Sequence, residues 1–118
     1  MAPVSLPELR PAGDDCVAEL VDRLGADRVS RDRARRTEAS RDHAWLSPVL
    51  ARRLPDVVAD VVVAPRSVGE VAAVLAVAHR RGAAVTARGK GTGNYGQAVP
   101  LAAGMVVDTG DLRGVLDV

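Results

Sequence analysis

Aromatic residues are nearly absent from this 118-residue chain, which has one tryptophan, one tyrosine and no phenylalanine. Its core must therefore be built from valine, leucine and alanine, and it has no row of aromatic faces on which nucleic-acid bases could stack. The net charge of +1 gives no overall positive field that would attract nucleic acid. We therefore expect no nucleic-acid partner.

Cysteine and long apolar runs are also scarce. Cys16 is the only cysteine, so an internal disulfide is impossible and a cytoplasmic location is the default expectation. The longest apolar run, Val71–Ala78, is too short to span a bilayer, and the first residues lack the charged and apolar regions of a signal peptide. A content of 47% hydrophobic and 26% charged residues is ordinary for a globular protein, and the length allows one domain at most.

The first half of the chain contains one clear helical pattern. Residues 1–13 carry three prolines and predict an irregular arm. A helix follows from Asp14, and Gly25 is suited to end it. Its apolar face is formed at helical spacing by Val17, Leu20, Val21 and Leu24.

The segment Arg28–Asp42 is dense in charge, with six arginines and four acidic residues when counted from Asp27. It could form an anion or nucleic-acid patch. Because acids are interleaved with the arginines and aromatics are missing, we favour a solvated connecting segment. Leu54, Pro55 and Asp56 predict a turn after it.

Residues 60–88 carry the pattern of a βαβ unit. The β-branched run 61–64 is typical of a strand covered on both faces of a parallel sheet. Ser67 and Glu70 form a capping box that opens a helix, and Gly82 is suited to end it. The strand 83–87 follows. The fold class is therefore α/β (α+β overall), a small βαβ parallel sheet with flanking helices, and the helix is expected to bury Val68, Val71, Ala72, Leu75 and Ala78, widened by Val74 and Val77.

The stretch RGKGTGNYGQ at residues 88–97 contains GTGNYG, which fits G-x-G-x-x-G. A dinucleotide-binding Rossmann loop must be followed by a helix, but only eight residues with Pro100 among them precede the next expected strand, Met105–Asp108. A P-loop is excluded because Ala84 stands where its first glycine is needed and Gly91 stands where serine or threonine is needed.

A third interpretation needs no helix: consecutive backbone N–H groups of a glycine-rich loop can form a nest for phosphate oxygens. The glycines of this loop permit positive φ angles and close approach, the two cations add charge, and the polar side chains add hydrogen bonds. A connection whose glycines only satisfy turn geometry is the alternative. The candidate binding residues are Arg88, Gly89, Lys90, Gly91, Thr92, Gly93, Asn94, Gly96 and Gln97.

The order of features in residues 59–118 resembles the start of a known flavoprotein domain. A VVVAP strand is followed by S-x-x-EV opening a helix, RRGAAVTARG, the glycine loop ending in GQ, and GMVVDTGDLRGV. This order is similar to the FAD-binding domain of the FAD-linked oxidases of the p-cresol methylhydroxylase (vanillyl-alcohol oxidase) type, which include D-lactate and glycolate dehydrogenases. Weaker similarity extends to LVDRLGADRVSRD before it.

The resemblance implies that the loop wraps the FAD pyrophosphate with residues 89–94, and that Gly96 and Gln97 continue toward the ribityl and flavin end. Members that attach flavin covalently at this loop carry histidine at the position of Thr92, so noncovalent FAD is implied. The resemblance also implies a division into a lead-in, residues 1–58, and the first part of a truncated FAD-binding domain, residues 59–118. The implied whole enzyme oxidises a 2-hydroxy acid or another alcohol, and we assign no catalytic residue within this fragment.

Other candidate residues are interpreted structurally. His43 and His79 lack metal-ligand spacing, Cys16 is expected to be a partly buried thiol, and Trp45 is expected to be a packing anchor. Asp108 ends a strand beside the proposed site and is at least equally a turn residue. A noncatalytic α/β module that binds a phosphate-containing ligand or partner remains the alternative function.

Overall fold

The computed structural model describes residues 8–45, 47–53 and 57–118. The turn expected at Leu54, Pro55 and Asp56, and the first seven residues of the expected arm, lie outside the described residues. In chain order the elements are α1 (Asp14–Leu24), the short 3-10 helix η1 (Ala26–Arg28), β1 (Val29–Ser30), α2 (Arg33–Ala39), α3 (Pro48–Arg53), β2 (Val61–Val63), α4 (Val68–Arg81), β3 (Val85–Arg88) and β4 (Met105–Asp108).

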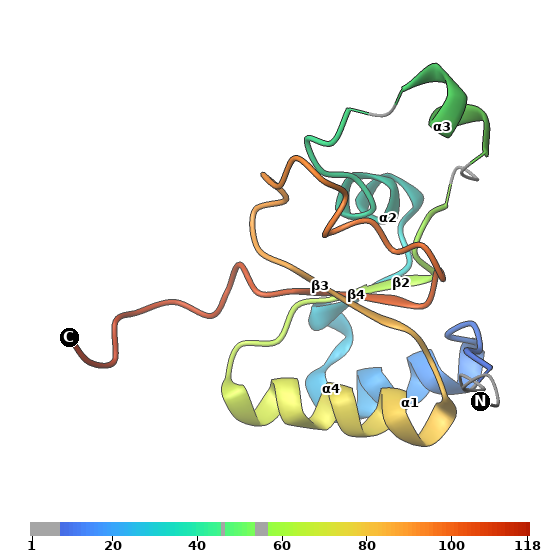
Figure 1. Ribbon diagram of the computed structural model, residues 1–118. Coiled ribbons are helices and arrows are strands. Elements are labelled where there is room, and N and C mark those ends of the chain that lie inside the picture. The colour runs from blue at the N-terminus through green and yellow to red at the C-terminus, as the bar shows by residue number, and fades with distance from the viewer. Residues whose placement is uncertain (1–7, 46, 54–56) are drawn as a thin grey trace, which may run out of the picture.

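The sheet has the strand order β1-β2-β4-β3, and the helices form a layer on each of its faces (Figure 1). β4 pairs in parallel with both β2 and β3, so the two strands of the predicted βαβ unit are parallel but separated by β4. β1 pairs antiparallel with β2, which makes the sheet mixed rather than wholly parallel. The α/β fold class is confirmed, with this antiparallel edge strand added.

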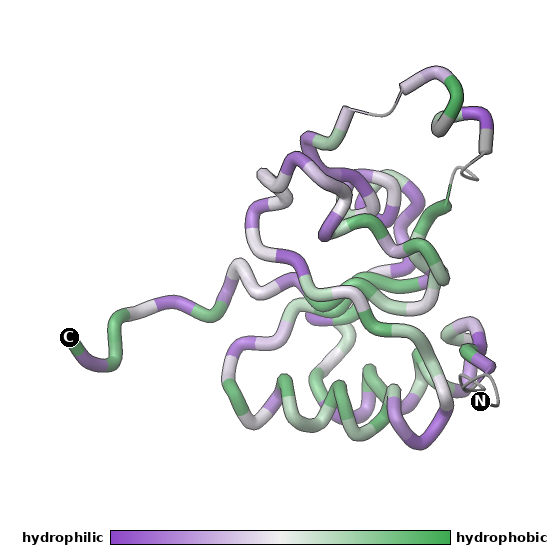
Figure 2. The backbone as a smooth tube through the Cα atoms, viewed as in Figure 1, coloured by the Kyte–Doolittle hydropathy of each residue, from purple (hydrophilic) through white to green (hydrophobic). Residues whose placement is uncertain are grey.

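The two faces of the sheet have separate apolar cores. Val61, Val63, Met105 and Val107 pack toward α1 and α4, whereas the alternate residues Val62 and Val106 pack toward Ala39 and Ala59. Because successive side chains of a strand point to opposite faces, an unbroken valine run is what two covered faces require. Hydrophobic residues concentrate in the strands and the α1–α4 layer, and the α2 layer is mostly hydrophilic (Figure 2).

The ends of α4 are formed as the sequence predicts. The Ser67 hydroxyl accepts a hydrogen bond from the Glu70 N–H at 3.1 Å, and the Glu70 carboxylate accepts one from the Arg66 N–H at 2.7 Å. At the other end Gly82 has the left-handed φ of 64°. The N–H of Ala83 reaches back to the Ala78 carbonyl at 2.9 Å, which completes a Schellman motif.

The buried face of α4 differs from the expected one. Val74, Val77 and Ala78 are buried, but Val68 is 78% exposed and Leu75 is 47% exposed. Ala72 is also exposed. Apolar residues occupy almost the whole run 71–78, so helical spacing does not single out one face. Packing against α1 and the sheet selects the face.

The segment predicted to be a solvated connector is more ordered than expected. It contains η1, β1 and α2, and α2 packs against β2. The side chain of Asp32 caps α2 by accepting the Arg35 N–H at 2.9 Å. The sequence analysis also did not anticipate α3. Within the described ranges, no helix is both long and apolar enough to cross a bilayer.

Ion pairs join α1 to α4 on the outer layer of the sheet. The Glu19 carboxylate accepts hydrogen bonds from Arg80 and from Arg81, the latter at 2.8 Å. These guanidinium groups hold the pKa of Glu19 below its ordinary value of 4.5, and the same pairing raises the pKa of Arg81. The Glu19 carboxylate therefore helps to hold α1 against α4.

We expect Glu19→Gln to lower the free energy of unfolding at neutral pH slightly, because the pair is partly exposed and screened by solvent. Since the folded pKa of Glu19 is lowered, its stabilisation is present above pH 4.5 and is lost as the pH falls through the folded value. Urea unfolding at several pH values should show the difference from the unaltered chain shrinking below pH 4.5. Asp22→Asn, on the same helix, is the matched control. A difference independent of pH contradicts this role of the carboxylate.

Candidate functional site

The glycine-rich connection leaves β3 at its carboxyl end and crosses the face of the sheet that carries α2 (Figure 1). It consists of turns and bends until β4 begins, and residues 89–104 contain no helix. Pro100 is buried in this stretch. The exclusion of a Rossmann loop is therefore confirmed, since no helix N-terminus faces a ligand here.

Hydrogen bonds fasten the start of this loop to the segment after α2. The Arg88 guanidinium donates to the carbonyls of Ala39, at 3.3 Å, and Arg41. The N–H of His43 donates to the Gly93 carbonyl at 2.9 Å. Positive charge at the end of α2 also complements its dipole. The loop and the end of α2 are thus held as two walls of one site.

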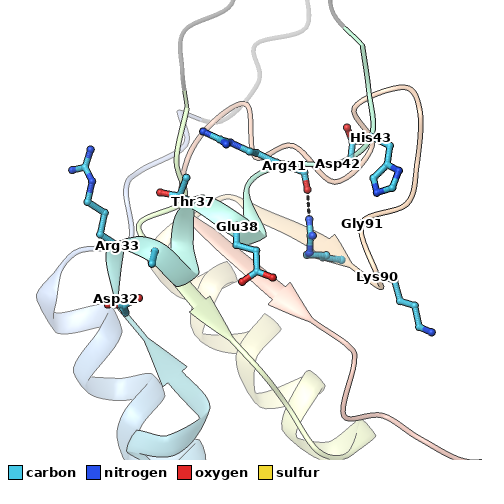
Figure 3. A pocket seen from close by; sticks show the side chains of 11 residues that line it. Asp32, Arg33, Thr37, Glu38, Arg41, Asp42, His43, Lys90 and Gly91 are labelled. Atoms are coloured by element: carbon cyan, nitrogen blue, oxygen red, sulfur yellow. Dashed lines mark hydrogen bonds between the residues drawn. The ribbon is translucent and has the colours of Figure 1, made fainter.

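An open cleft of about 920 Å³ lies between these walls (Figure 3). Its lining carries cations and carboxylates in similar number, so charge alone does not make it an anion site. Figure 3 shows the Lys90 side chain extending away from the other labelled side chains. The lining residues are Asp32, Arg33, Ala34, Thr37, Glu38, Arg41, Asp42, His43, Arg88, Lys90 and Gly91.

The expected positive φ angles occur at two of the four loop glycines. Gly91 has φ 68° and Gly96 has φ 80°, whereas Gly89 and Gly93 are not in this region. A Cβ on Gly91 would lie 2.2 Å from the Arg88 guanidinium, and a Cβ on Gly89 would meet nothing within 4 Å. Gly91 and Gly96 are therefore the two glycines of this loop that the local backbone requires.

The loop presents a row of backbone donors. Across the described part of the chain, no acceptor is found for the N–H groups of the six consecutive residues 89–94. Gly91 is nevertheless buried. Backbone N–H groups withdrawn from water normally find a partner, so the unpaired N–H of buried Gly91 favours an external acceptor, and the N–H groups of its more exposed neighbours are free to donate to the same group.

The remaining predicted site residues are spread along the loop. Thr92, Asn94 and Gln97 are exposed, and the Gln97 side chain accepts the N–H of Tyr95 at 3.1 Å. Gln97 also lines a second groove, of about 630 Å³, over the free edge of β3. The loop thus spans from the cleft at Gly91 to this groove at Gly96 and Gln97.

The structure shows the surroundings of the other residues considered in the sequence analysis. Asp108 accepts the Gly110 N–H at 2.9 Å, as a turn residue does, and also pairs with Arg35. Cys16 is buried in the α1–α4 core, where burial raises the pKa of its thiol. The interpretation of Trp45 as a packing anchor is wrong: its side chain is 80% exposed and belongs to neither apolar core. Trp45 lies in the segment after α2. The layer formed by α2 is mostly hydrophilic, so little apolar surface is available there to bury the ring.

Sequence reasoning missed the wall opposite the glycine loop. The sequence analysis gives His43 no binding role, because it lacks metal-ligand spacing. Its backbone, rather than its ring, makes the contact with Gly93. Asp42 lies beside it, with its Oδ2 atom buried and lacking a partner. No local signal marks these residues, because their proximity to the loop depends on α2 packing on the sheet.

Comparison with known proteins gives the family. A family described as FAD binding domain matches residues 59–118, just over half of the chain. This chain belongs to the FAD binding domain family. The matched residues contain β2, α4, β3, the glycine loop and β4. The resemblance seen in the sequence is therefore confirmed.

The relatives of this FAD binding domain are much longer proteins, and only a small part of each matches this chain. Glycolate oxidase subunit GlcD of Escherichia coli strain K12 is 40% identical over 58 residues, which are 49% of this chain and 12% of the relative. The same subunit from Escherichia coli O6:H1 gives the same values. The chain thus spans 12% of the curated relatives' length.

Two solved structures share the fold. Alkyldihydroxyacetonephosphate synthase superposes with a TM-score of 0.74 at 21% identity, over 98% of this chain and 22% of that chain. p-Cresol methylhydroxylase superposes with a TM-score of 0.69 at 16% identity, over 93% of this chain and 22% of that chain. The likeness covers the α1 and α2 segments as well as residues 59–118.

Gly104, which ends the loop, should tolerate no side chain. It has φ 70°, and a Cβ would lie 2.4 Å from the Ala84 carbonyl oxygen. We expect Gly104→Ala to destabilise the fold by about 2 kcal/mol or more, because both the backbone angle and this contact must change. Urea unfolding measures the loss, with Gly89→Ala as the matched control. Equal midpoints for the two variants would show that Gly104 is not constrained.

Proposed function

We propose that this chain binds the diphosphate of FAD with its glycine-rich loop, as the first part of the FAD-binding domain of a flavin-dependent oxidoreductase. The row of unpaired N–H groups at residues 89–94 carries this proposal. Diphosphate oxygens are suitable acceptors for such a row, and the loop borders an open cleft. Membership of the FAD binding domain family supports FAD as the source of the diphosphate.

The residues of the loop take different parts in this proposal. Residues 89–94 face the diphosphate with their backbone, and Gly96 and Gln97 continue toward the ribityl and flavin end. Arg88 holds the loop against the carbonyls of Ala39 and Arg41, so its main contribution is the position of the loop. Lys90 adds charge from the rim.

The mixed charge of the cleft favours recognition by the backbone. The lining holds four cations and three carboxylates, namely Arg33, Arg41, Arg88 and Lys90 against Asp32, Glu38 and Asp42. The net field on a phosphate group is therefore small, whereas N–H groups that lie in a fixed loop donate with little reorganisation. Substitution of a constrained glycine should consequently matter more than loss of the Lys90 charge.

The proposed reaction belongs to the complete oxidoreductase. When bound, FAD would supply the hydride-accepting chemistry for a substrate C–H bond, and the protein would supply position and electrostatics. The similarity to a glycolate oxidase subunit supports a 2-hydroxy acid as substrate. We assign no catalytic residue to this chain, and the proposal places residues 1–58 as a lead-in and residues 59–118 as the first part of the domain. The rest of the domain is its partner around the cofactor.

Noncovalent attachment is part of the proposal. Thr92 stands at the position that carries histidine in members with flavin attached at this loop, and a threonine hydroxyl does not provide that imidazole. FAD should therefore leave the protein on denaturation. Flavin fluorescence that remains with the denatured chain on a gel contradicts this point.

Titration of the purified chain with FAD, with the heat of binding measured by calorimetry, tests the proposed function. We expect the chain to bind FAD and Gly91→Ala to weaken binding by about tenfold, which corresponds to about 1.4 kcal/mol of backbone strain and loss of the Arg88 position. Lys90→Ala should have a smaller effect, since the backbone makes most contacts. Gly69→Ala, on α4 and outside the loop, is the matched control, because its Cβ would make only an ordinary contact with the Ser67 hydroxyl at 3.8 Å.

Three results contradict the proposed function. The unaltered chain fails to bind FAD; or Gly91→Ala and Gly69→Ala bind equally; or Lys90→Ala has the largest effect, which indicates recognition by charge. Urea unfolding of each variant separates loss of binding from loss of fold. If Gly91→Ala does not fold, Gly93→Ala replaces it, because the group that its Cβ meets is the flexible Gln97 side chain.

A further inference from the structure

The two aromatic residues of this chain are both on the surface. Trp45 is 80% exposed and Tyr95 is 89% exposed, and neither belongs to an apolar core. Aromatic side chains usually supply large buried area, and this chain has no other aromatic side chain with which to build a core. Placing both of them in water is a cost to the isolated fold that a ligand or partner can offset.

The two aromatic residues also lie on segments that meet. The N–H of His43 donates to the carbonyl of Gly93 at 2.9 Å, and this bond joins the segment after α2 to the glycine loop. Trp45 is two residues beyond His43, and Tyr95 is two residues beyond Gly93. The fold therefore brings to one loop junction two rings that are 50 positions apart in the sequence.

Each aromatic residue lies in, or just after, a turn that a side-chain hydrogen bond holds in place. The Asp42 carboxylate accepts the N–H of Ala44 at 2.8 Å, just before Trp45. The Gln97 side-chain oxygen accepts the N–H of Tyr95 itself at 3.1 Å. The backbone that carries each ring is thus fixed although the ring is exposed. Such pre-ordering lowers the entropy cost of binding a flat ligand.

We propose that Trp45 and Tyr95 are stacking residues for the planar rings of the dinucleotide whose diphosphate lies on the loop. This inference rests on the proposed function and extends it from the phosphates to the rings. A dinucleotide carries one heteroaromatic ring at each end, one sugar or sugar alcohol away from the diphosphate. Tyr95 lies within the loop beside Gly96 and Gln97, and Trp45 lies on the segment after α2, two residues beyond His43. Stacking on an aromatic side chain suits either ring, because each has a π face.

Three probes distinguish the two ring sources. FAD has both rings, FMN has the isoalloxazine without adenine, and ADP has adenine with the diphosphate. Trp45→Leu and Tyr95→Leu remove one stacking face each, whereas Trp45→Phe and Tyr95→Phe retain one. Affinity is measured by calorimetry with each probe, and the urea midpoint of each variant is compared with that of the unaltered chain.

Fluorescence gives a second readout. Trp45 is the only tryptophan, so its emission reports on one position. ADP does not absorb this emission, and quenching by ADP therefore requires contact rather than energy transfer. The emission of FMN itself is quenched when isoalloxazine stacks on tryptophan or tyrosine, so FMN emission in the leucine variants should recover.

We expect each leucine variant to weaken FAD binding by about 5- to 150-fold and the phenylalanine variants to keep most of the affinity. Loss of ADP binding in one variant assigns adenine to that residue, and loss of FMN binding assigns isoalloxazine; either pattern supports stacking. Binding of all three probes that is unchanged in both leucine variants overturns stacking, leaves the proposed function intact and indicates a protein partner for the rings. An unaltered chain that binds none of the probes overturns both proposals.

Discussion

The amino-terminal ends of the three parallel strands are joined by contacts around Gly104. These contacts set the register of the sheet, on which the positions of the other elements depend. The N–H of Asp60 donates to the Gly104 carbonyl at 2.8 Å, and the Gly104 N–H returns a hydrogen bond to the Asp60 carboxylate at 3.0 Å. The next residue, Met105, donates to the Ala84 carbonyl at 2.9 Å. The same carboxylate accepts the N–H of Ala12 at 3.1 Å. This junction sets β4 between β2 and β3 and ties the amino-terminal arm to all three.

The site at the other end of the strands depends on this register. Because β3 and β4 are parallel and in level register, the loop that leaves the carboxyl end of β3 must run back along the sheet to the amino-terminal end of β4. It does so over the α2 face, where Arg88 and the backbone of His43 hold it. The loop therefore does not need its own secondary structure to be fixed, and its N–H groups stay available. The phosphate site that we propose for this loop therefore needs no helix.

Local features of the sequence were predicted well. The Ser67–Glu70 cap and Gly82 of α4, and the absence of a helix before Met105, depend on residues close together in the chain. The two-sided strand 61–63 was also predicted, because its valines alternate between two cores. The exposed face of α4 and the exposed Trp45 were not, because an apolar side chain is compatible with burial anywhere. Only its neighbours in space decide whether it is covered.

The sequence by itself determined the ends of α4, the βαβ order, the glycine loop and its family, since each is written in short-range spacing or in the order of motifs. The tertiary structure alone decided that β4 lies between β2 and β3 and that β1 adds an antiparallel edge. It also decided that a charge-dense segment becomes the second wall of the cleft. The physical reason is the same in each case: these arrangements arise from hydrogen bonds and packing between residues far apart in the chain, and no local pattern encodes which distant groups will meet.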